Sequence, residues 1–244
     1  FSPARPAQIC AFEYIYFARP DSVIEGRSVY EARKEMGRQL ALETPADVDV
    51  IIPVPDSGVP AAIGFSEASG IPFELGIIRS HFVGRTFIQP TQDRRDLSVR
   101  RKHAANAAVV KGKRVLLIDD SIVRGTTSLK IVRMMREAGA VEVHFRSACP
   151  PIKHPDFYGI DMAGRDELIA ANMSVEDMAT KLEADSLGFL TVNGLYQAVI
   201  GAPRNDKRPQ LADHYFTGEY PTLLADHDRD LSAKEFQLSF LVDA

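Results

Sequence analysis

The segment VLLIDDSIVRGTT, residues 115–127, constrains the fold of this 244-residue chain more than any other feature. An aliphatic run is followed directly by Asp119 and Asp120, and then by a short turn that ends in Arg-Gly-Thr-Thr. The aliphatic run predicts a buried strand, and a helix is expected to begin near Thr126. A strand, an acidic turn and a helix in direct succession are typical of α/β proteins.

The rest of the chain shows the same alternation of strand and helix. Apolar residues at helical spacing predict helices at 28–43, 60–68 and 127–140, the last with Leu129, Val132, Met135 and Ala138 on one face and Gly139 as its stop. Short aliphatic runs predict strands at 48–54, 71–78, 114–119 and 141–148. Strands that are apolar throughout predict a mainly parallel sheet covered by helices on both faces, so the expected class is α/β.

Composition narrows the classes of function. No apolar run is long enough to span a bilayer and the start has no signal-peptide pattern, so we expect a cytoplasmic protein without a membrane partner. A net charge of -4 gives no case for nucleic acid. Cys10 and Cys149 match neither a disulfide framework nor a zinc site, so reduced thiols are expected. The Phe at position 1 and the extended start predict a fragment of a longer polypeptide.

Positive charge is concentrated in one part of this acidic chain. Between Arg79 and Arg114 there are ten Lys or Arg residues against two acidic ones, Asp93 and Asp96. The segment is expected to handle an anion, although a solvated basic surface would look the same for any single arginine.

The residues after the aspartates, 121–127, are suited to hold a phosphate, and we call them the phosphate loop. A loop that enters a helix offers free backbone N–H groups and the positive end of the helix dipole. Gly125 lets the backbone approach closely, and Ser121, Thr126 and Thr127 add hydroxyl donors. The aspartates would repel a phosphate, so we expect them to face ribose hydroxyls or a magnesium ion that bridges them to a second anion. Alternatively, an Asp pair at a strand end can be only a capping or turn device.

The block does not fit other nucleotide motifs, because it has neither the Gly-Lys ending of a P-loop nor GxGxxG. It resembles the phosphoribosyl pyrophosphate (PRPP) binding loop of type I phosphoribosyltransferases. Five further blocks resemble one family among them, the glutamine PRPP amidotransferases: CAFEYIYFARPDS, VPDSGVPAAIGF, VGRTFIQPTQ, VRRK and FYGIDM. The similarity covers about residues 5–201. It implies the type I fold, a twisted, mainly parallel sheet flanked by helices with a flexible lid loop.

The resemblance implies a role for each matching residue. Asp119 and Asp120 would contact the ribose hydroxyls and, together with Ser57, a Mg²⁺ ion. The substrate's 5'-phosphate would lie in the phosphate loop, against Ser121, Arg124, Gly125, Thr126 and Thr127. The pyrophosphate loop would be Pro55-Asp56-Ser57-Gly58, where small residues expose backbone donors, although such a turn is also common for its own sake.

In the family, the stretch that matches about residues 82–102 is a loop that orders over bound PRPP. Basic residues of this loop, and one just before it, would gather around the pyrophosphate. They would stabilise charge on the leaving group and exclude water from an oxocarbenium-like state. They are Arg79, Arg85, Arg100, Arg101 and Lys102, of which Arg85, Arg101 and Lys102 are expected to be catalytic. Phe82 stands where the family commonly has Tyr, which removes any hydroxyl role there.

The reaction implied is attack of ammonia on PRPP to give 5-phosphoribosylamine and pyrophosphate, the first step of de novo purine synthesis. The complete enzymes begin with a glutaminase domain, which we expect to be missing, so the chain should use free ammonia but not glutamine. Some relatives carry an iron–sulfur cluster on four cysteines. Only Cys10 matches a ligand position and Asp156 replaces another, so no cluster is predicted. Feedback inhibition by purine nucleotides and a homo-oligomer are also implied.

Three regions are expected: a connector and domain start at 1–25, the phosphoribosyltransferase domain at 26–203 and a polar C-terminal tail at 204–244. Two other functions stay open. A salvage phosphoribosyltransferase would join PRPP to a nucleobase, but its base pocket cannot be placed in the sequence. A non-catalytic regulator could bind PRPP or nucleotides, although it would have less use for the basic lid.

Overall fold

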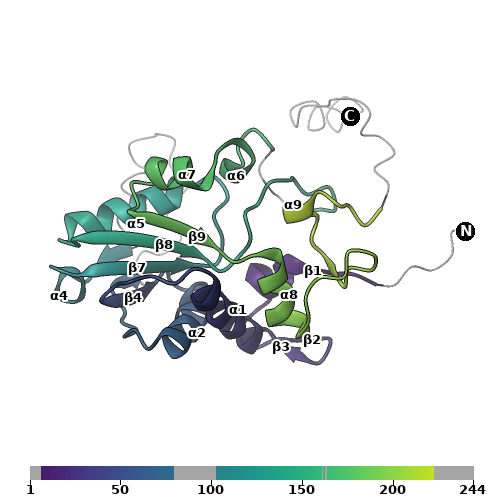
Figure 1. Ribbon diagram of the computed structural model, residues 1–244, viewed down its shortest axis with the longest axis horizontal. Coiled ribbons are helices and arrows are strands. Elements are labelled where there is room, and N and C mark those ends of the chain that lie inside the picture. Colours follow the sequence, from purple (N-terminus) through teal and green to yellow (C-terminus); the bar gives the residue numbers. More distant parts are fainter. Residues whose placement is uncertain (1–6, 80–102, 161, 163, 223–244) are drawn as a thin grey trace, which may run out of the picture.

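A computed structural model describes residues 7–79, 103–160, 162 and 164–222 of the chain (Figure 1). Its centre is a sheet of four parallel strands in the order β4 (Val50–Pro53), β7 (Arg114–Asp119), β8 (Glu142–Ser147) and β9 (Ser186–Phe189). Three of these strands lie where the sequence predicts them, and the α/β class with a mainly parallel sheet is confirmed.

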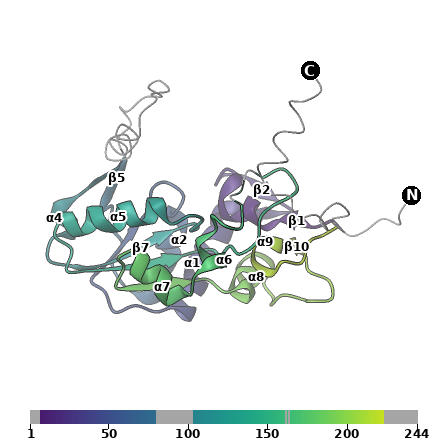
Figure 2. The same cartoon turned by 90° about the horizontal axis from the view of Figure 1, so that it is seen from above.

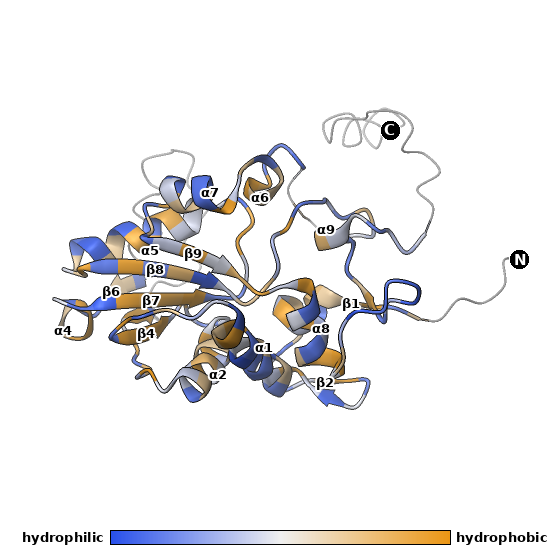
Figure 3. Ribbon diagram, in the orientation of Figure 1, coloured by the Kyte–Doolittle hydropathy of each residue, from blue (hydrophilic) through white to orange (hydrophobic). Residues whose placement is uncertain are grey.

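Helices cover both faces of this sheet, and its strands β4 and β7 are apolar on both sides (Figure 3). Leu116 and Ile118 of β7 belong to the core cluster shared with α1 (Val29–Glu43), α2 (Val59–Ser69) and α8 (Val192–Ile200). Val115 and Leu117, which alternate with them, belong to the cluster on the opposite face. That cluster includes side chains from α4 (Ala107–Val110), α5 (Thr126–Glu137), α6 (Ile169–Asn172) and α7 (Val175–Lys181).

Helices α1, α2 and α5 lie within a few residues of the ranges that the sequence predicts, and α5 ends at Glu137 rather than at residue 140. Ser28 caps α1, since its Oγ accepts from the backbone N–H of Glu31 at 3.3 Å. Helix α5 buries Ile131, Val132 and Met135. The buried face of α5 differs slightly from the predicted one, since Leu129 is only partly buried at the edge of the core.

The strand predicted at 71–78 is wrong over most of its length. Only Ile77–Arg79 forms a strand, β5, and it pairs antiparallel with β6 (His103–Ala105) outside the central sheet. Phe73 forms a single parallel bridge to Ile51 on the free edge of β4. Pro72 has no N–H with which to continue that pairing.

The two ends of the described chain come together beside the sheet (Figure 2). Strand β1 (Ile9–Cys10) pairs in parallel with β10 (Leu211–Ala212) and is followed by a π-helical turn, η1 (Glu13–Phe17). The hairpin β2–β3 (Val23–Ile24 and Arg27–Ser28) then leads into α1.

Residues 204–222 differ from the surface tail that their polar composition predicts. Leu211, Tyr215 and Phe216 are buried, the last two from the short helix α9 (His214–Thr217). The Tyr215 ring packs edge-on against Phe12, with centroids 4.7 Å apart. A few apolar residues spaced among polar ones are enough to fasten this segment to the core. None of the helices in the described ranges is long and apolar enough to cross a membrane.

Candidate active site

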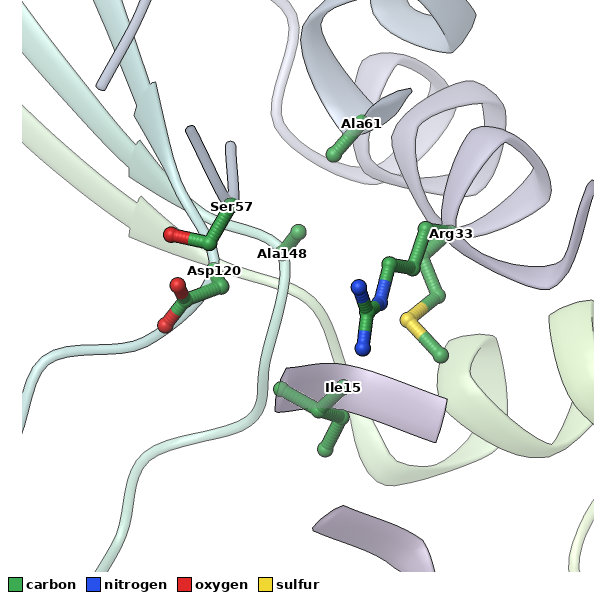
Figure 4. A pocket seen from close by; sticks show the side chains of 7 residues that line it. Ile15, Arg33, Ser57, Ala61, Asp120 and Ala148 are labelled. Atoms are coloured by element: carbon green, nitrogen blue, oxygen red, sulfur yellow. The ribbon is translucent and has the colours of Figure 1, made fainter. Parts of the chain in front are cut away.

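The two loops that the sequence singles out meet at one edge of the sheet. Strands β4 and β7 are neighbours and parallel, so the pyrophosphate loop after β4 and the acidic turn after β7 emerge side by side. Their closeness explains Gly58, where a Cβ would lie 2.4 Å from the Ile118 carbonyl oxygen. Ser57 and Asp120 line one small cavity together with Arg33 and Ile15 (Figure 4). The structure therefore brings the two predicted metal-binding segments together.

The adjacent aspartates are both buried, with 8% and 9% of their surface exposed. Asp119 accepts from the Asp120 backbone N–H at 2.9 Å, and Asp120 accepts from the hydroxyls of Ser121, at 2.6 Å, and Ser57. Burial raises the pKa of both carboxyls, and the charge of Asp120 raises the pKa of Asp119 further. Within the described ranges no ion pair joins either carboxylate to Arg, Lys or His. Neither carboxylate is directly paired with a basic side chain, so the two together suit a hard cation.

The donor atoms at this edge of the sheet suit a cation that is also coordinated by a bound ligand. Among the residues that the structure describes, no group of three or more His, Cys, Asp or Glu side chains is placed to hold a metal. Mg²⁺ is typically bound through one or two carboxylates and completes its shell with water and substrate phosphates. Asp119, Asp120 and the Ser57 hydroxyl match that donor set.

Arg33 lines the same cavity, although it belongs to none of the sequence motifs. It lies on α1 with 4% of its surface exposed, and it donates to the backbone oxygens of Tyr14 at 2.8 Å and Ala18 at 2.9 Å. Both acceptors are neutral, so its charge acts on Asp120 across the cavity. The sequence does carry a signal, because Arg33 shares the buried row of the helix with Val29 and Met36.

The phosphate loop ends at an open helix N-terminus. Gly125 is the N-cap of α5 with φ of +77°, and no side chain caps the first N–H groups. Thr126 and Thr127 are exposed beside them. An anion placed here would meet backbone donors, hydroxyls and the positive end of the helix dipole. The Arg124 side chain, which is expected to contact the phosphate, instead donates to Glu167 at 2.7 Å and 3.1 Å.

Gly125→Ala should weaken phosphate binding roughly tenfold and destabilise the fold by about 1–2 kcal/mol, because an L-residue is strained at this φ. A Cβ there would also lie 2.9 Å from Cδ1 of Ile169. Gly201→Ala is the matched control, since Gly201 has φ of +82° and nothing within 4 Å of its Cβ position. Calorimetric titration with inorganic phosphate separates the two effects. If Gly125→Ala and Gly201→Ala bind phosphate equally well, phosphate binding does not require a glycine at position 125.

The start of the basic segment lies next to the pyrophosphate loop. Arg79, the last residue of β5, forms an ion pair with Asp56, and both side chains are at least half exposed. Two predicted ligand residues are therefore adjacent. The other basic residues of the predicted lid lie outside the described residues, so their roles stay predictions: Arg85, Arg100, Arg101 and Lys102.

The residues that match cluster ligand positions lie in a hydrogen-bonded group around α9. Asp156 Oδ1 accepts from His214 Nε2 at 2.8 Å and from the Tyr215 hydroxyl at 3.0 Å. Cys10 Sγ lies 3.3 Å from that hydroxyl, and burial raises the pKa of the thiol. Cys149 is a separate buried thiol, whose Sγ lies 3.2 Å from the Pro150 carbonyl oxygen.

Comparison with known proteins agrees with this architecture. Amidophosphoribosyltransferase of Rhizobium etli is 62% identical over 226 residues, which are 92% of this chain and 46% of that protein. The enzyme of Bacillus subtilis is 54% identical over 214 residues, or 88% of this chain and 45% of that protein. The chain thus spans about half the length of these curated relatives.

Among solved structures, the glutamine PRPP amidotransferase from B. subtilis complexed with ADP and GMP has a TM-score of 0.84 and 51% identity. The match covers 93% of this chain and 50% of that one. The family model described as "Phosphoribosyl transferase domain" matches residues 25–155, which include α1, both loops and the acidic turn. The chain therefore belongs to the phosphoribosyltransferase family, with amidophosphoribosyltransferases as its relatives at 62% and 54% identity.

Proposed function

We propose that this chain catalyses the phosphoribosyl transfer of an amidophosphoribosyltransferase, in which ammonia displaces pyrophosphate from PRPP to give 5-phosphoribosylamine. The observation that carries the proposal is the meeting of the pyrophosphate loop with the Asp119–Asp120 turn at the cavity between Ser57 and Asp120. High identity to amidophosphoribosyltransferases supports this choice within the phosphoribosyltransferase family.

The geometry suits a ligand with an anionic group at each end. Backbone donors at Gly125 and the hydroxyls of Thr126 and Thr127 would bind the 5'-phosphate. The loop at 55–58, with Arg79 next to it, would bind the pyrophosphate. Because the two loops follow neighbouring parallel strands, a ribose that links the two groups would lie over Asp119 and Asp120. PRPP has this arrangement of groups.

Asp119, Asp120 and Ser57 are the residues we propose to hold Mg²⁺. A cation bound there would neutralise charge on the pyrophosphate as it leaves. The carboxyls must be ionised to bind it, and burial raises their pKa values, so cation binding would compete with protonation. Arg33 opposes that protonation at Asp120.

The chain's own part in catalysis would be positioning and exclusion of water. Ammonia is already a competent nucleophile, so no general base is required for its attack, and fixed orientation of the two reactants accounts for much of the acceleration. Arg85, Arg101 and Lys102 are proposed to cover the pyrophosphate and stabilise its developing charge. The concentration of basic residues after Arg79 supports this role.

Purine nucleotides are the inhibitors we propose. A nucleoside monophosphate carries the same 5'-phosphate and ribose as PRPP, so the phosphate loop and the aspartates would accept either. The B. subtilis relative was solved as a complex with ADP and GMP, which supports nucleotide binding in a protein of this architecture.

Pyrophosphate release from Mg-PRPP tests the proposal, with ammonium at mildly alkaline pH, glutamine or a panel of nucleobases as the acceptor. We expect turnover with ammonium and none with glutamine alone. Turnover that requires a nucleobase would instead indicate a salvage enzyme. PRPP or nucleotide binding without turnover would indicate a regulator.

A further inference from the structure

The phosphate loop is supported by a segment to which the sequence gives no role, residues 164–172. This segment is a turn at 165–167 followed by the short helix α6. The backbone N–H of Ile169 donates to the Val123 carbonyl at 3.0 Å, which fastens the two segments together. The side chains of Ile169 and Leu182, both buried, are the groups that a Cβ on Gly125 would meet. The loop therefore rests on α6 and α7.

A second link holds the side chain of the phosphate loop's only arginine. Arg124 Nε and Nη2 both donate to Glu167 Oε2, at 3.1 Å and 2.7 Å, across 43 residues of sequence. Both side chains are about half exposed, so the pair adds little to global stability. Its effect is local, since it fixes where the guanidinium lies relative to the open N-terminus of α5.

Asn172 holds the supporting segment in shape. Its Nδ2 lies 2.8 Å from the carbonyl oxygens of Arg165 and Leu168, and 3.2 Å from that of Asp166. An amide group has two hydrogens, which these three converging oxygens share. The carbonyls belong to the turn that presents Glu167 and leads into Ile169. The N–H groups of Glu167 and Leu168 also close the turn, by donating to the Gly164 carbonyl, and without the Asn172 donor the turn would be held less firmly.

We propose that residues 164–172 form a brace that positions the phosphate loop for the substrate's 5'-phosphate, and that Asn172 is the positioning residue on which the brace depends. The identity of the ligand rests on the proposed function, whereas the brace rests on the contacts alone. The pyrophosphate loop is built differently, from β4, α2 and the Ile118 carbonyl. A defect in the brace should therefore affect one end of the substrate and leave the other intact.

Two ligands allow the two ends of the substrate site to be tested separately. Ribose 5-phosphate carries the 5'-phosphate, and inorganic pyrophosphate represents the leaving group. Asn172→Asp replaces the shared donor with an acceptor that faces three carbonyls, so ribose 5-phosphate should bind roughly tenfold more weakly, while the pyrophosphate Kd should stay within about twofold. Asn172→Ala, which adds no repulsion, should show a smaller loss of the same kind. Calorimetric titration of the full 244-residue chain with each ligand gives both constants.

The matched control is Asn193→Asp on α8, where the side-chain oxygen accepts from the Arg204 N–H and the acceptor survives the change. Its ribose 5-phosphate Kd should match that of the wild type. Equal losses for both ligands, or no loss in either Asn172 variant, would overturn the brace.

Hydrogen exchange makes the test independent of the ligand. In the free protein, Asn172→Asp should speed exchange at the amides of 121–127 and 164–169 while the strands of the central sheet keep their protection. Unchanged exchange in both segments would overturn the brace. Wild-type protein that binds neither ligand, combined with the expected exchange pattern, would instead refute the proposed function and leave the brace standing.

Discussion

Replacing Asp120 with asparagine should lower kcat/KM for Mg-PRPP roughly 10²- to 10³-fold while leaving the protein at least as stable as the wild type. The activity falls because the amide cannot supply the second charge that a cation needs at the Ser57–Asp119–Asp120 site. Stability is maintained because Asp119 and Asp120 are buried side by side, and removing one charge relieves their repulsion. Pyrophosphate release and thermal unfolding measure the two effects on the same preparation.

Loss of activity without loss of stability distinguishes a cation ligand from a carboxylate that only supports the fold. Asp21→Asn makes the same chemical change in an exposed pair with Arg19, so both its kcat/KM and its Tm should stay close to those of the wild type. A lower Tm together with lower activity in Asp120→Asn would show that the carboxylate is a structural element. Unchanged activity would exclude it from the site.

The largest loss of stability is expected for Asp156→Asn, about 2–4 kcal/mol in the free energy of unfolding. The carboxylate is fully buried and accepts four hydrogen bonds, from His214, Tyr215 and the backbone N–H groups of Tyr158 and Ile160. An asparagine can present only one acceptor oxygen, so its amide would face two donors in a buried place. Urea unfolding at neutral pH measures the difference.

The pH dependence of this loss has a definite sign. Burial would raise the pKa of Asp156, but the hydrogen bonds outweigh it and the pKa lies below its usual range. Since the folded pKa is depressed, the stabilisation is fully present above the unfolded value of about 3.9 and is lost as the pH falls through the folded value. The gap between wild type and variant should therefore narrow only in strong acid.

Asp206→Asn is the matched control for Asp156, because Asp206 is exposed and pairs with Arg204 at the surface. It should change the free energy of unfolding by less than about 0.5 kcal/mol. A similar loss in both variants, or a gap for Asp156→Asn that is already closed at neutral pH, would contradict the account of the buried carboxylate.

The sequence predicts the parts of the fold whose signals are local. Strand β7, its acidic turn and α5 follow from one continuous block, because a buried strand and an amphipathic helix each have their own hydrophobic period. The meeting of Ser57 with Asp120 follows from strand order, since neighbouring parallel strands deliver their loops to the same edge. Arg33 could also have been found, as a charged residue on an otherwise apolar helix face.

The parts that were missed depend on contacts between distant residues. An apolar composition at 71–78 predicts a strand, yet the chain there makes only one bridge to the sheet edge, where the Pro72 carbonyl accepts from Ile51 but Pro72 has no N–H to donate. Helix α6 has only four residues, too few to show a period, and its role comes from Val123, which precedes it by more than forty positions. Leu211 pairs with Ile9 through backbone hydrogen bonds, which the pattern of side chains in the sequence does not predict.

The pairing of β1 with β10 also sets the order in which the molecule can be assembled. Cys10 and Tyr215, which meet beside this pair, are 205 residues apart, whereas β4, β7 and β8 join within the first two thirds of the chain. Closing so long a loop is entropically costly and slow, and the C-terminal partner is synthesised after the strands of the central sheet. The contacts around Phe12 are thus completed only after the strands of the central sheet have been synthesised. A chain that stops before Leu211 would leave that apolar surface open to aggregation.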